Sequence, residues 1–497
     1  MNQMNQVHVR VHPHVRGPKV ERFVYSQFAE HLGRCIYPGI WVGDRKDIPN
    51  DGGIRLDVVE ALKALEIPAL RWPGGCFADN YHWMDGIGPR EQRPKRHNLW
   101  WKQSESNAFG THEFLRFCEM IGTEPYICVN VGSGTVEEAR SWVEYCNCVE
   151  ETHLTQLRAQ NGAPTPWKVR FWGVGNELWG CGGRMRPDQY ADLFCQFANF
   201  MRRTDPTIEL IACGSSSQNM EYWNEIFLER VFSYRLHHWG PLFEYLAIHH
   251  YLGRTLSDLN FTDDDYYGLI GELDQLRKHV EKAAALCRAY STPDAPIRLI
   301  IDEWGTWYVE AVTENGLYQQ NTMMDAIVAA LGFHLYHDYA EDIFMTNMAQ
   351  TINVLQALIL TKGPKMCKTP TYYVFDLFRG HKDGERLPVD VSSPPLPRVE
   401  GRAAVSVSAT RAREKGQVTL SLVNAHLEVP ASVAIDLGQP VTRVEGRILA
   451  SDDVHDHNTP DEPERVVPRD CKVAPNADGT VTVELPPHSV AALTVSL

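Results

Sequence analysis

The sequence predicts an α/β fold, a (β/α)₈ TIM barrel, with a C-terminal antiparallel β-sandwich domain. Between about residues 20 and 380, short β-branched runs alternate with longer amphipathic stretches, and beyond residue 381 short runs of alternating apolar and polar residues follow one another. Strands that alternate with helices indicate βαβ units and a parallel sheet, whereas alternating runs broken by turns indicate antiparallel strands. A chain of 497 residues is long enough for both domains.

Eight runs are the predicted barrel strands. Most of them end in glycine or in a polar residue, and amphipathic stretches lie between them. They are residues 21–33, 67–75, 124–132, 169–177, 208–214, 244–251, 297–304 and 343–350. Eight strand–helix units in about 360 residues fit a TIM barrel with insertions. The main insertion, residues 79–109, follows the second strand, and its aromatic residues favour an ordered loop at the barrel mouth.

Two of the connecting helices can be predicted in detail. In residues 186–206, six apolar side chains recur at the spacing of one helical face: Tyr190, Leu193, Phe194, Phe197, Phe200 and Met201. Pro187 suits the first turn of this helix, and Asp205-Pro206 should end it. Residues 369–384 predict the last helix of the barrel, which should end before Gly380.

The change of pattern sets the predicted domain boundaries. We expect a catalytic barrel over residues 18–380 and a β-sandwich over residues 381–497. The sandwich strands are predicted in residues 403–411, 417–425, 431–437, 442–450, 480–486 and 489–497. The N-terminal segment 1–17 also alternates, so we expect it to add a strand to the sandwich.

The composition excludes several classes of protein. A formal net charge of −15 disfavours a nucleic-acid backbone as partner. No run of about 18 apolar residues occurs, so we expect no transmembrane helix and no membrane partner. The N-terminal segment lacks the apolar stretch of a secretory signal, which favours the cytoplasm.

The cysteines and the short motifs give no sign of a metal or cofactor. Twelve cysteines are scattered without the spacing of a disulfide framework, which predicts reduced thiols in a cytosolic protein. The chain has no HExxH, paired CxxC or EF-hand spacing, and neither a Walker A motif nor a credible GxGxxG motif follows a strand. We therefore expect no metal site and no cofactor.

Polar residues gather where the predicted barrel strands end, which is where TIM-barrel enzymes carry their active sites. An unpaired buried polar group costs about 1–3 kcal/mol, so a purely structural barrel has no need of such a ring. The candidate site residues are Glu30, Arg71, Cys76, Asn176, Glu177, His249, Tyr251, Glu303 and Gln350.

Glu177 and Glu303 form the best acid pair, because they end the fourth and seventh strands and can meet across the barrel. Cleavage of a glycosidic bond needs two carboxyl groups that flank it. Asn176 would suit a hydrogen bond to a sugar hydroxyl, although a turn residue is the alternative. Tyr251 could orient and ionise Glu303, and His249 could be either a site residue or a structural histidine.

At these residues the sequence resembles glycoside hydrolase family 51, chiefly α-L-arabinofuranosidases. The resemblance rests on RWPGGCFADNYHWMDGIGPREQRP, WGVGNELWGCGG, IHHY and IIDEWGTWY, and it covers nearly the whole chain. It implies that Glu177 is the acid/base and Glu303 the nucleophile. It also implies sugar or active-site hydrogen bonds from five further residues: Glu30, Arg71, Asn176, Tyr251 and Gln350. Cys76 departs from many members, which have asparagine there, although others carry cysteine.

The resemblance implies a retaining, exo-acting α-L-arabinofuranosidase that needs no cofactor. Its substrates would be arabino-oligosaccharides or arabinoxylan, and the enzyme would be a homo-oligomer, commonly a hexamer. Two alternatives stay open from the residues. One is an endo-β-1,4-glucanase or β-xylosidase on the same fold, since related barrels change substrate through their loops. The other is a carbohydrate-binding protein without catalysis.

Overall fold

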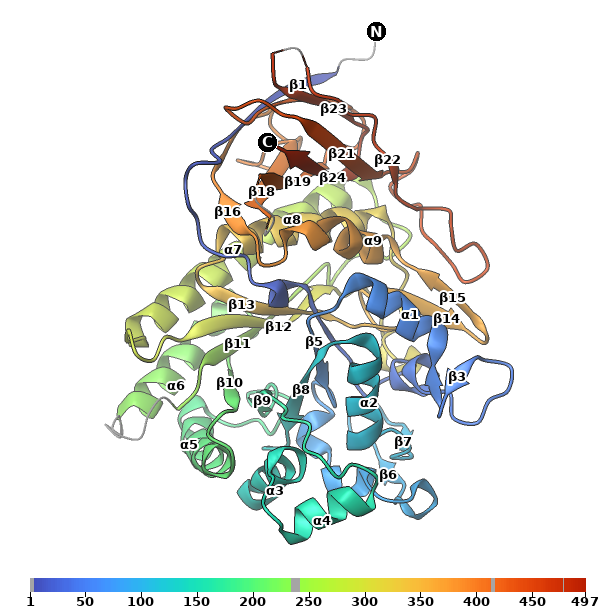
Figure 1. Ribbon diagram of the computed structural model, residues 1–497, viewed down its shortest axis with the longest axis vertical. Helices are drawn as coiled ribbons and strands as arrows, with labels where there is room; N and C mark the ends of the chain where they lie inside the picture. The colour runs from blue at the N-terminus through green and yellow to red at the C-terminus, as the bar shows by residue number, and fades with distance from the viewer. Residues whose placement is uncertain (1–3, 234–241, 413–415, 477) are drawn as a thin grey trace.

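The computed structural model describes residues 4–233, 242–412, 416–476 and 478–497 and shows two packed domains. In Figure 1 the β-sandwich lies above the barrel, and helices α8 (Met323–Asp338) and α9 (Pro370–Leu377) lie between them. The (β/α)₈ barrel with a C-terminal β domain is therefore confirmed.

The predicted barrel strands all form. They are β2 (Ser26–Phe28), β5 (Ala69–Trp72), β8 (Glu124–Val129), β9 (Phe171–Val174), β10 (Glu209–Cys213), β11 (Tyr245–Leu252), β12 (Arg298–Thr306) and β13 (Ile343–Ala349). They close in the order β10-β11-β12-β13-β2-β5-β8-β9, and each neighbouring pair is parallel. Because all strands run the same way, the residues that follow them meet at one mouth.

The other barrel helices cover the outside of the strands. They are α1 (Leu56–Leu65), α2 (Thr111–Ile121), α3 (Val136–Asn147), α4 (His153–Gln160), α5 (Pro187–Thr204), α6 (Glu221–Ser233) and α7 (Asp263–Tyr290). Helix α5 agrees with its prediction except at Phe200, which is 51% exposed. The buried face of the helix is therefore narrower than predicted. The last helix, α9, ends at Leu377, before Gly380 as predicted, and a 3₁₀ turn over Phe378–His381 follows it.

The loops of the barrel contain short hairpins. They pair β3 (Asn50–Asp51) with β4 (Ile54–Arg55), β6 (Arg96–His97) with β7 (Ser104–Glu105), and β14 (Ile359–Lys362) with β15 (Lys365–Lys368). The β6–β7 hairpin lies within the insertion 79–109, which is therefore an ordered part of the fold. The insertion also contains 3₁₀ turns, one of them over Trp83–Gly86.

The second domain is a sandwich of two sheets. One sheet has the order β17-β1-β20-β23 and the other β16-β18-β19-β24-β21-β22. The strands are β1 (Asn5–Val11), β16 (Glu385–Leu387), β17 (Val389–Ser392), β18 (Val405–Arg411), β19 (Gln417–Asn424), β20 (Ala431–Asp436), β21 (Arg443–Leu449), β22 (Arg469–Asp470), β23 (Val481–Leu485) and β24 (Ser489–Ser496).

The prediction of a wholly antiparallel sandwich is wrong for one pair of strands. Strand β1, blue among the red and orange strands in Figure 1, runs parallel to β20 and antiparallel to β17. A strand that arrives from the distant N-terminus needs no hairpin, so it can pair in either direction. Residues 1–3 of the expected N-terminal strand lie outside the described residues.

Helix α8 is the main contact between the domains. Nearly all of its residues are buried, as expected of a helix covered on every side. Its polar side chains His334 and His337, together with His381 of the 3₁₀ turn that follows α9, form what we call the histidine cluster. His334 Nδ1 and Nε2 lie 2.8 Å from Ser406 Oγ and Ser421 Oγ of the sandwich.

The rest of the histidine cluster makes similar contacts. His337 Nδ1 lies 2.8 Å from Ser408 Oγ, and its Nε2 lies 2.7 Å from Tyr25 Oη in the barrel. His381 contacts the hydroxyls of the sandwich residues Thr410 and Ser421 over 2.9 Å. Imidazoles thus join the two domains through hydroxyl groups.

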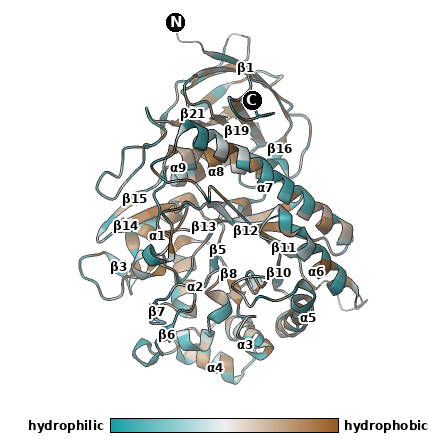
Figure 2. Ribbon diagram, turned by 180° about the vertical axis from the view of Figure 1, so that it is seen from behind, coloured by the Kyte–Doolittle hydropathy of each residue, from teal (hydrophilic) through white to brown (hydrophobic). Residues whose placement is uncertain are grey.

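Hydropathy follows this architecture. Figure 2 shows hydrophobic colours along the barrel strands β12 and β13 and hydrophilic colours over much of α7. Within the described residues, no helix combines the length and the apolar character that crossing a membrane requires.

Candidate active site

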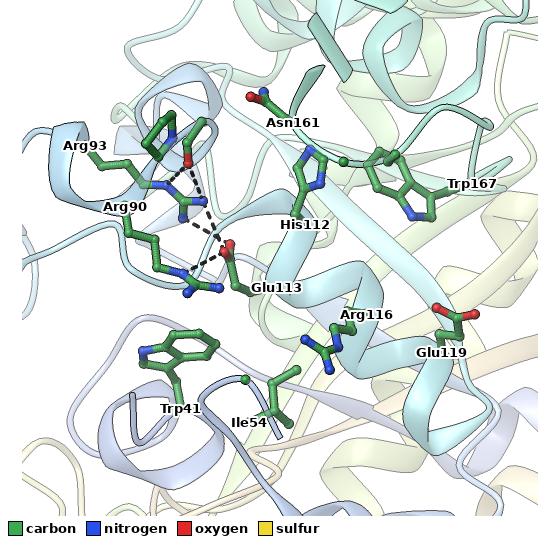
Figure 3. A pocket seen from close by; sticks show the side chains of 15 residues that line it. Trp41, Ile54, Arg90, Arg93, His112, Glu113, Arg116, Glu119, Asn161 and Trp167 are labelled. Atoms are coloured by element: carbon green, nitrogen blue, oxygen red, sulfur yellow. Dashed lines mark hydrogen bonds and ion pairs between the residues drawn. The ribbon is translucent and has the colours of Figure 1, made fainter. Parts of the chain in front are cut away.

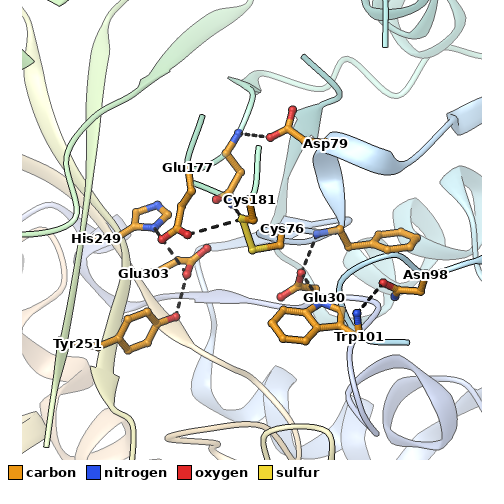
Figure 4. The surroundings of a disulfide bond; sticks show 12 residues. Glu30, Cys76, Asp79, Asn98, Trp101, Glu177, Cys181, His249, Tyr251 and Glu303 are labelled. Atoms are coloured by element: carbon orange, nitrogen blue, oxygen red, sulfur yellow. Dashed lines mark hydrogen bonds and ion pairs between the residues drawn. A yellow bond between two sulfur atoms is a disulfide. The ribbon is translucent and has the colours of Figure 1, made fainter. Parts of the chain in front are cut away.

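Glu177 and Glu303 lie close together at the barrel mouth, with His249 beside both. His249 Nδ1 lies 3.0 Å from Glu177 Oε1 and 3.6 Å from Glu303 Oε2. One carboxylate oxygen of each glutamate falls within 4.8 Å of the other. Figure 4 shows the two carboxylates and the imidazole facing one another. The fourth and seventh strands therefore do bring their glutamates together.

The pairing of β11 with β12 sets the position of Glu303. His249 is the register partner of Glu303, so their side chains leave the sheet on the same face. Tyr251, two residues further along β11, donates its hydroxyl hydrogen to Glu303 Oε2 over 2.8 Å. Gly75 leaves room on the other side, since a Cβ there would lie 2.6 Å from Glu303 Oε1.

The surroundings of Glu303 favour its ionised form. Burial would raise the pKa of this carboxyl, but the charges of His249 and Arg71 and the hydrogen bond from Tyr251 hold it below its ordinary value. The same carboxylates act on His249 in return. Burial opposes its charge, yet Glu303 and Glu177 raise the pKa of the imidazole above its ordinary value.

Arg71 contacts three polar side chains at the site, those of Glu303, Asn176 and Asp302. Its guanidinium is fully buried and donates to Glu303 Oε1 over 2.9 Å and to Asn176 Oδ1 over 2.6 Å. Its Nε lies 3.3 Å from Asp302 Oδ2. Asp302 in turn accepts hydrogen bonds from Tyr126 and Asn347. The buried cation is thereby balanced by two carboxylates.

Glu177, in the loop after β9, has an unusual backbone conformation. Its φ is 44°, in the left-handed region that costs a residue with a side chain about 1–3 kcal/mol. Asp79 holds the preceding backbone: its Oδ2 accepts from the Asn176 amide over 2.7 Å, and its Oδ1 accepts from the amides of Val131 and Gly132. Burial raises the pKa of Asp79 to about 7, against the effect of these hydrogen bonds.

Glu30 lies just after β2 and is surrounded by hydrogen-bond donors. Its Oε1 accepts from the Phe77 amide over 2.9 Å and from Trp101 Nε1 over 3.0 Å, and its Oε2 accepts from Gln350 Nε2 over 3.0 Å. Burial, with the nearby charge of Glu303, raises the pKa of Glu30 to about 7 although the three donors oppose it. Gln350 Oε1 is buried and finds no hydrogen-bond partner among the described residues.

Cys76 is not a free thiol. It forms a disulfide with Cys181, so the prediction of twelve reduced cysteines is wrong for this pair. The two are 105 residues apart, but the loops after β5 and β9 meet at the mouth and bring their Cα atoms to 5.5 Å. The other ten cysteines are free. A disulfide sulfur carries no hydrogen, so in this state Cys76 cannot donate to a substrate.

Two cavities lie beside the insertion rather than at the glutamates. The larger, about 540 Å³, is formed by the insertion, α2 and the loop before β9. Figure 3 shows Arg90 stacked over Trp41 and both Arg90 and Arg93 paired with Glu113. The other, about 410 Å³, is lined by residues that include Phe77 and Glu105. Neither cavity contains a candidate site residue.

The nine candidate residues predicted from the sequence lie at one mouth of the barrel, but other residues that support them were not predicted. The pattern at the strand ends does not identify Asp79, Trp101, Cys181 or Asp302. Trp101 and Asp79 belong to the insertion, whose path no local pattern fixes. For Asp302 a signal exists in the sequence, because an acidic residue next to Glu303 in an otherwise apolar strand must find buried partners.

Comparisons with known proteins cover the whole site. Residues 61–264 match the model of the α-L-arabinofuranosidase 1 domain, and residues 302–489 match that of the α-L-arabinofuranosidase C-terminal domain. The chain is 42% identical to the "Intracellular exo-alpha-L-arabinofuranosidase" of Bacteroides ovatus over 485 residues. The aligned region covers 95% of this chain and 92% of that protein.

Solved structures give the same result. The GH51 arabinofuranosidase from Xanthomonas axonopodis pv. citri is 38% identical, with a TM-score of 0.92 over 99% of this chain and 100% of that one. The α-L-arabinofuranosidase from Thermotoga maritima, solved as an arabinose complex, is 32% identical, with a TM-score of 0.87 over 99% and 100%.

Proposed function

This chain belongs to glycoside hydrolase family 51, the α-L-arabinofuranosidases, and from that membership we propose how it acts and on what. It removes terminal non-reducing α-L-arabinofuranosyl groups from arabino-oligosaccharides or arabinoxylan. The reaction is a double displacement that retains the configuration of the anomeric carbon. The name of the Bacteroides ovatus relative supports exo action, since that protein is called an exo-α-L-arabinofuranosidase.

The observation that carries the retaining mechanism is the closeness of the two carboxylates. Retaining enzymes hold them about 5–5.5 Å apart, whereas inverting enzymes need about 6.5–9.5 Å to admit a water molecule. In this chain one oxygen of Glu177 and one of Glu303 are within 4.8 Å of each other. The gap suits direct attack by a carboxylate on the sugar.

The different surroundings of the glutamates support different roles. Glu303 is the nucleophile, because Arg71 and Tyr251 keep it ionised and its side chain is only 8% exposed. Glu177 is the acid/base, because its side chain is 19% exposed and would be reached by the leaving group and by water. Glu177 first gives a proton to the leaving oxygen while Glu303 attacks. It then takes a proton from the water that releases the sugar.

The remaining candidates would bind the sugar. Gln350 Oε1 is a buried acceptor that a sugar hydroxyl would satisfy, and Glu30, held by three donors, lies next to it. Asn176 accepts from Arg71 through its side-chain carbonyl and directs one side-chain N–H to Cys181 Sγ over 3.8 Å, so its other N–H would be offered to a substrate oxygen. His249 hydrogen-bonds Glu177. It would help to reset the protonation states of the two glutamates after each reaction.

Assembly and location are part of the proposal. We assign the enzyme to the cytoplasm, in keeping with the relative that is called intracellular. We also propose a homo-oligomer, a hexamer in its commonest form, as the family resemblance implies.

A screen of aryl glycosides tests the substrate. The enzyme should hydrolyse the aryl α-L-arabinofuranoside and leave the β-xyloside, β-glucoside and β-galactofuranoside nearly untouched. Polymeric β-glucan should not lose viscosity. Preferred cleavage of the xyloside or of β-glucan would favour the β-xylosidase or endoglucanase alternative. Binding of arabinose without any hydrolysis would favour the non-catalytic one.

A further inference from the structure

Two sulfur atoms stand beside the carboxylate of Glu177. Cys181 Sγ lies 3.6 Å from Glu177 Oε2, and the two sulfurs of Cys76 and Cys181 lie within 4.8 Å of a Glu177 oxygen. Figure 4 shows this carboxylate between Cys181 on one side and His249 on the other. Cys76 lies in the loop after β5, and Glu177 and Cys181 lie in the loop after β9. The barrel strands fix the positions of both loops.

Reduction changes the chemistry of this group of atoms. The sulfurs of a disulfide are poor metal ligands, whereas thiolates are strong ones. A phosphine that reduces the bond takes the oxygen of one water molecule and becomes a phosphine oxide, and each sulfur gains one hydrogen. A divalent cation that then binds displaces the two thiol protons to solvent, and no other bond changes.

We propose that the reduced enzyme binds one thiophilic divalent cation through Cys76, Cys181 and Glu177. Two thiolates and a carboxylate oxygen are a typical set for Zn²⁺ or Cd²⁺, which take tetrahedral sites with Zn–S distances of about 2.3 Å. The Cα separation of 5.5 Å already suits two cysteines that bind one ion. The fourth position is left to water or to His249, which contacts the other oxygen of Glu177.

A second group of ligand atoms is the natural competitor. Glu177, His249 and Glu303 also place one ligand atom each within 4.8 Å, and reduction does not alter them. That group offers two hard oxygen ligands and one nitrogen, so Cd²⁺, a soft cation, should prefer the thiolates. The reduced state also matters in the proposed location, because cytosolic proteins keep their cysteines reduced.

Cadmium titration of the reduced and the oxidised enzyme tests the site. Reduction uses a phosphine, because dithiols would themselves chelate Cd²⁺. Binding is followed by calorimetry and by the ultraviolet charge-transfer absorption of cadmium–thiolate bonds. The variants are Cys181→Ser and Cys76→Ser, and the matched control is Cys195→Ser, a half-buried free cysteine on α5.

The reduced enzyme and the Cys195→Ser control should bind one equivalent with thiolate absorption, and the oxidised enzyme should lack that absorption. Each site variant should bind at least about tenfold more weakly, since even the loss of an outer-shell contact costs roughly 10–100-fold in metal affinity. A chelator should reverse binding. The proposal would be overturned if the oxidised enzyme bound Cd²⁺ as tightly as the reduced enzyme, or if both folded serine variants kept the affinity of the reduced wild type.

An activity assay adds a consequence that rests on the proposed function. If Glu177 is the acid/base, bound Cd²⁺ should abolish hydrolysis of the aryl arabinofuranoside by the reduced enzyme, and a chelator should restore it. Spectroscopic binding without inhibition would uphold the site and overturn the role of Glu177. The two failures are therefore distinguishable.

Discussion

Trp101 donates its indole N–H to Glu30 Oε1 over 3.0 Å, although 71 residues separate the two. Trp101 belongs to the insertion 79–109, and Glu30 lies just after the first barrel strand, β2. The insertion therefore reaches into the candidate active site and supplies one of the three donors of this carboxylate. Its neighbour Trp100 is 38% exposed and lies on the outside of the same loop.

Replacement of Trp101 by phenylalanine should weaken catalysis without unfolding the protein. The ring is kept, but Glu30 loses a hydrogen bond of a kind worth about 1.5–3 kcal/mol to a charged group. We expect kcat/KM for the aryl arabinofuranoside to fall about tenfold or more. Trp100→Phe is the matched control and should keep the activity. Equal activity of the two variants would mean that Glu30 does not depend on this loop.

Tyr251→Phe should lower kcat and leave KM nearly unchanged. The variant removes the hydroxyl that donates to Glu303 Oε2 and leaves the ring in contact with Trp307. A nucleophile without this donor is less well oriented and less firmly ionised, so we expect a loss of about 10–100-fold in kcat. Tyr222→Phe, at an exposed tyrosine of α6, is the control. A rise in KM alone would assign Tyr251 to substrate binding instead.

The histidine cluster should make the protein unstable in mild acid. Burial lowers the pKa of His334 and of His381 to about 3, and that of His337 well below its ordinary value of 6.5. The unfolded chain takes up these protons below about pH 6.5, but the folded protein does not. Stability is therefore complete above that pH, and each histidine removes about 1.4 kcal/mol per pH unit as the pH falls from there toward the pKa of that histidine in the folded protein.

The His334→Gln variant isolates one of these protons. Urea unfolding at several pH values should show a lower stability than wild type at pH 8, because a buried imidazole loses its hydroxyl partners. Between pH 6 and 4 its stability should fall less steeply than that of wild type, by about one proton. His8→Gln, at an exposed histidine of β1, should change neither quantity. An unchanged slope for His334→Gln would contradict the neutral, buried state.

Light scattering tests the proposed assembly. The chain has a mass of 56.4 kDa, so a hexamer would be six times heavier. We expect an oligomer at micromolar concentration. A species with the mass of one chain would reject the proposal.

The fold could be predicted because eight short, mostly apolar runs alternate with amphipathic stretches, and most of these runs end in a polar residue or glycine. Position at the strand ends then identified Glu177, Glu303 and Tyr251, since a parallel barrel collects these ends at one mouth. His249 and His250 could also be separated: alternation sends His249 to Glu177, while His250 contacts His279 outside the barrel.

Features that depend on the path of long loops could not be predicted. The Cys76–Cys181 bond requires the loops after β5 and β9 to meet, and no spacing of cysteines shows that. The inward position of Asp302 follows from a shift in the pairing of β12 with β13 between Ile301 and Trp304, which alternation alone does not predict. The parallel pairing of β1 with β20 likewise depends on contacts between distant parts of the chain.

The assignment of roles to Glu177 and Glu303 is the central claim, and alanine variants separate the two. Glu303→Ala lacks the nucleophile, so azide can enter the vacated space and attack the sugar directly. Glu177→Ala keeps the nucleophile, and a good leaving group needs little protonation, so the covalent intermediate forms and then waits for a base. General acid–base help is worth about 10²–10⁴ in rate, so this deficit should grow as the leaving group becomes poorer.

The measurement is the anomeric configuration, by NMR, of the arabinofuranosyl azide that each variant forms. Glu177→Ala should give the product of retained configuration, because azide releases the covalent intermediate without a base. Glu303→Ala should give the product of inverted configuration, because azide attacks once. The opposite pair of results, inverted from Glu177→Ala and retained from Glu303→Ala, would reverse the roles of the two glutamates and contradict the account.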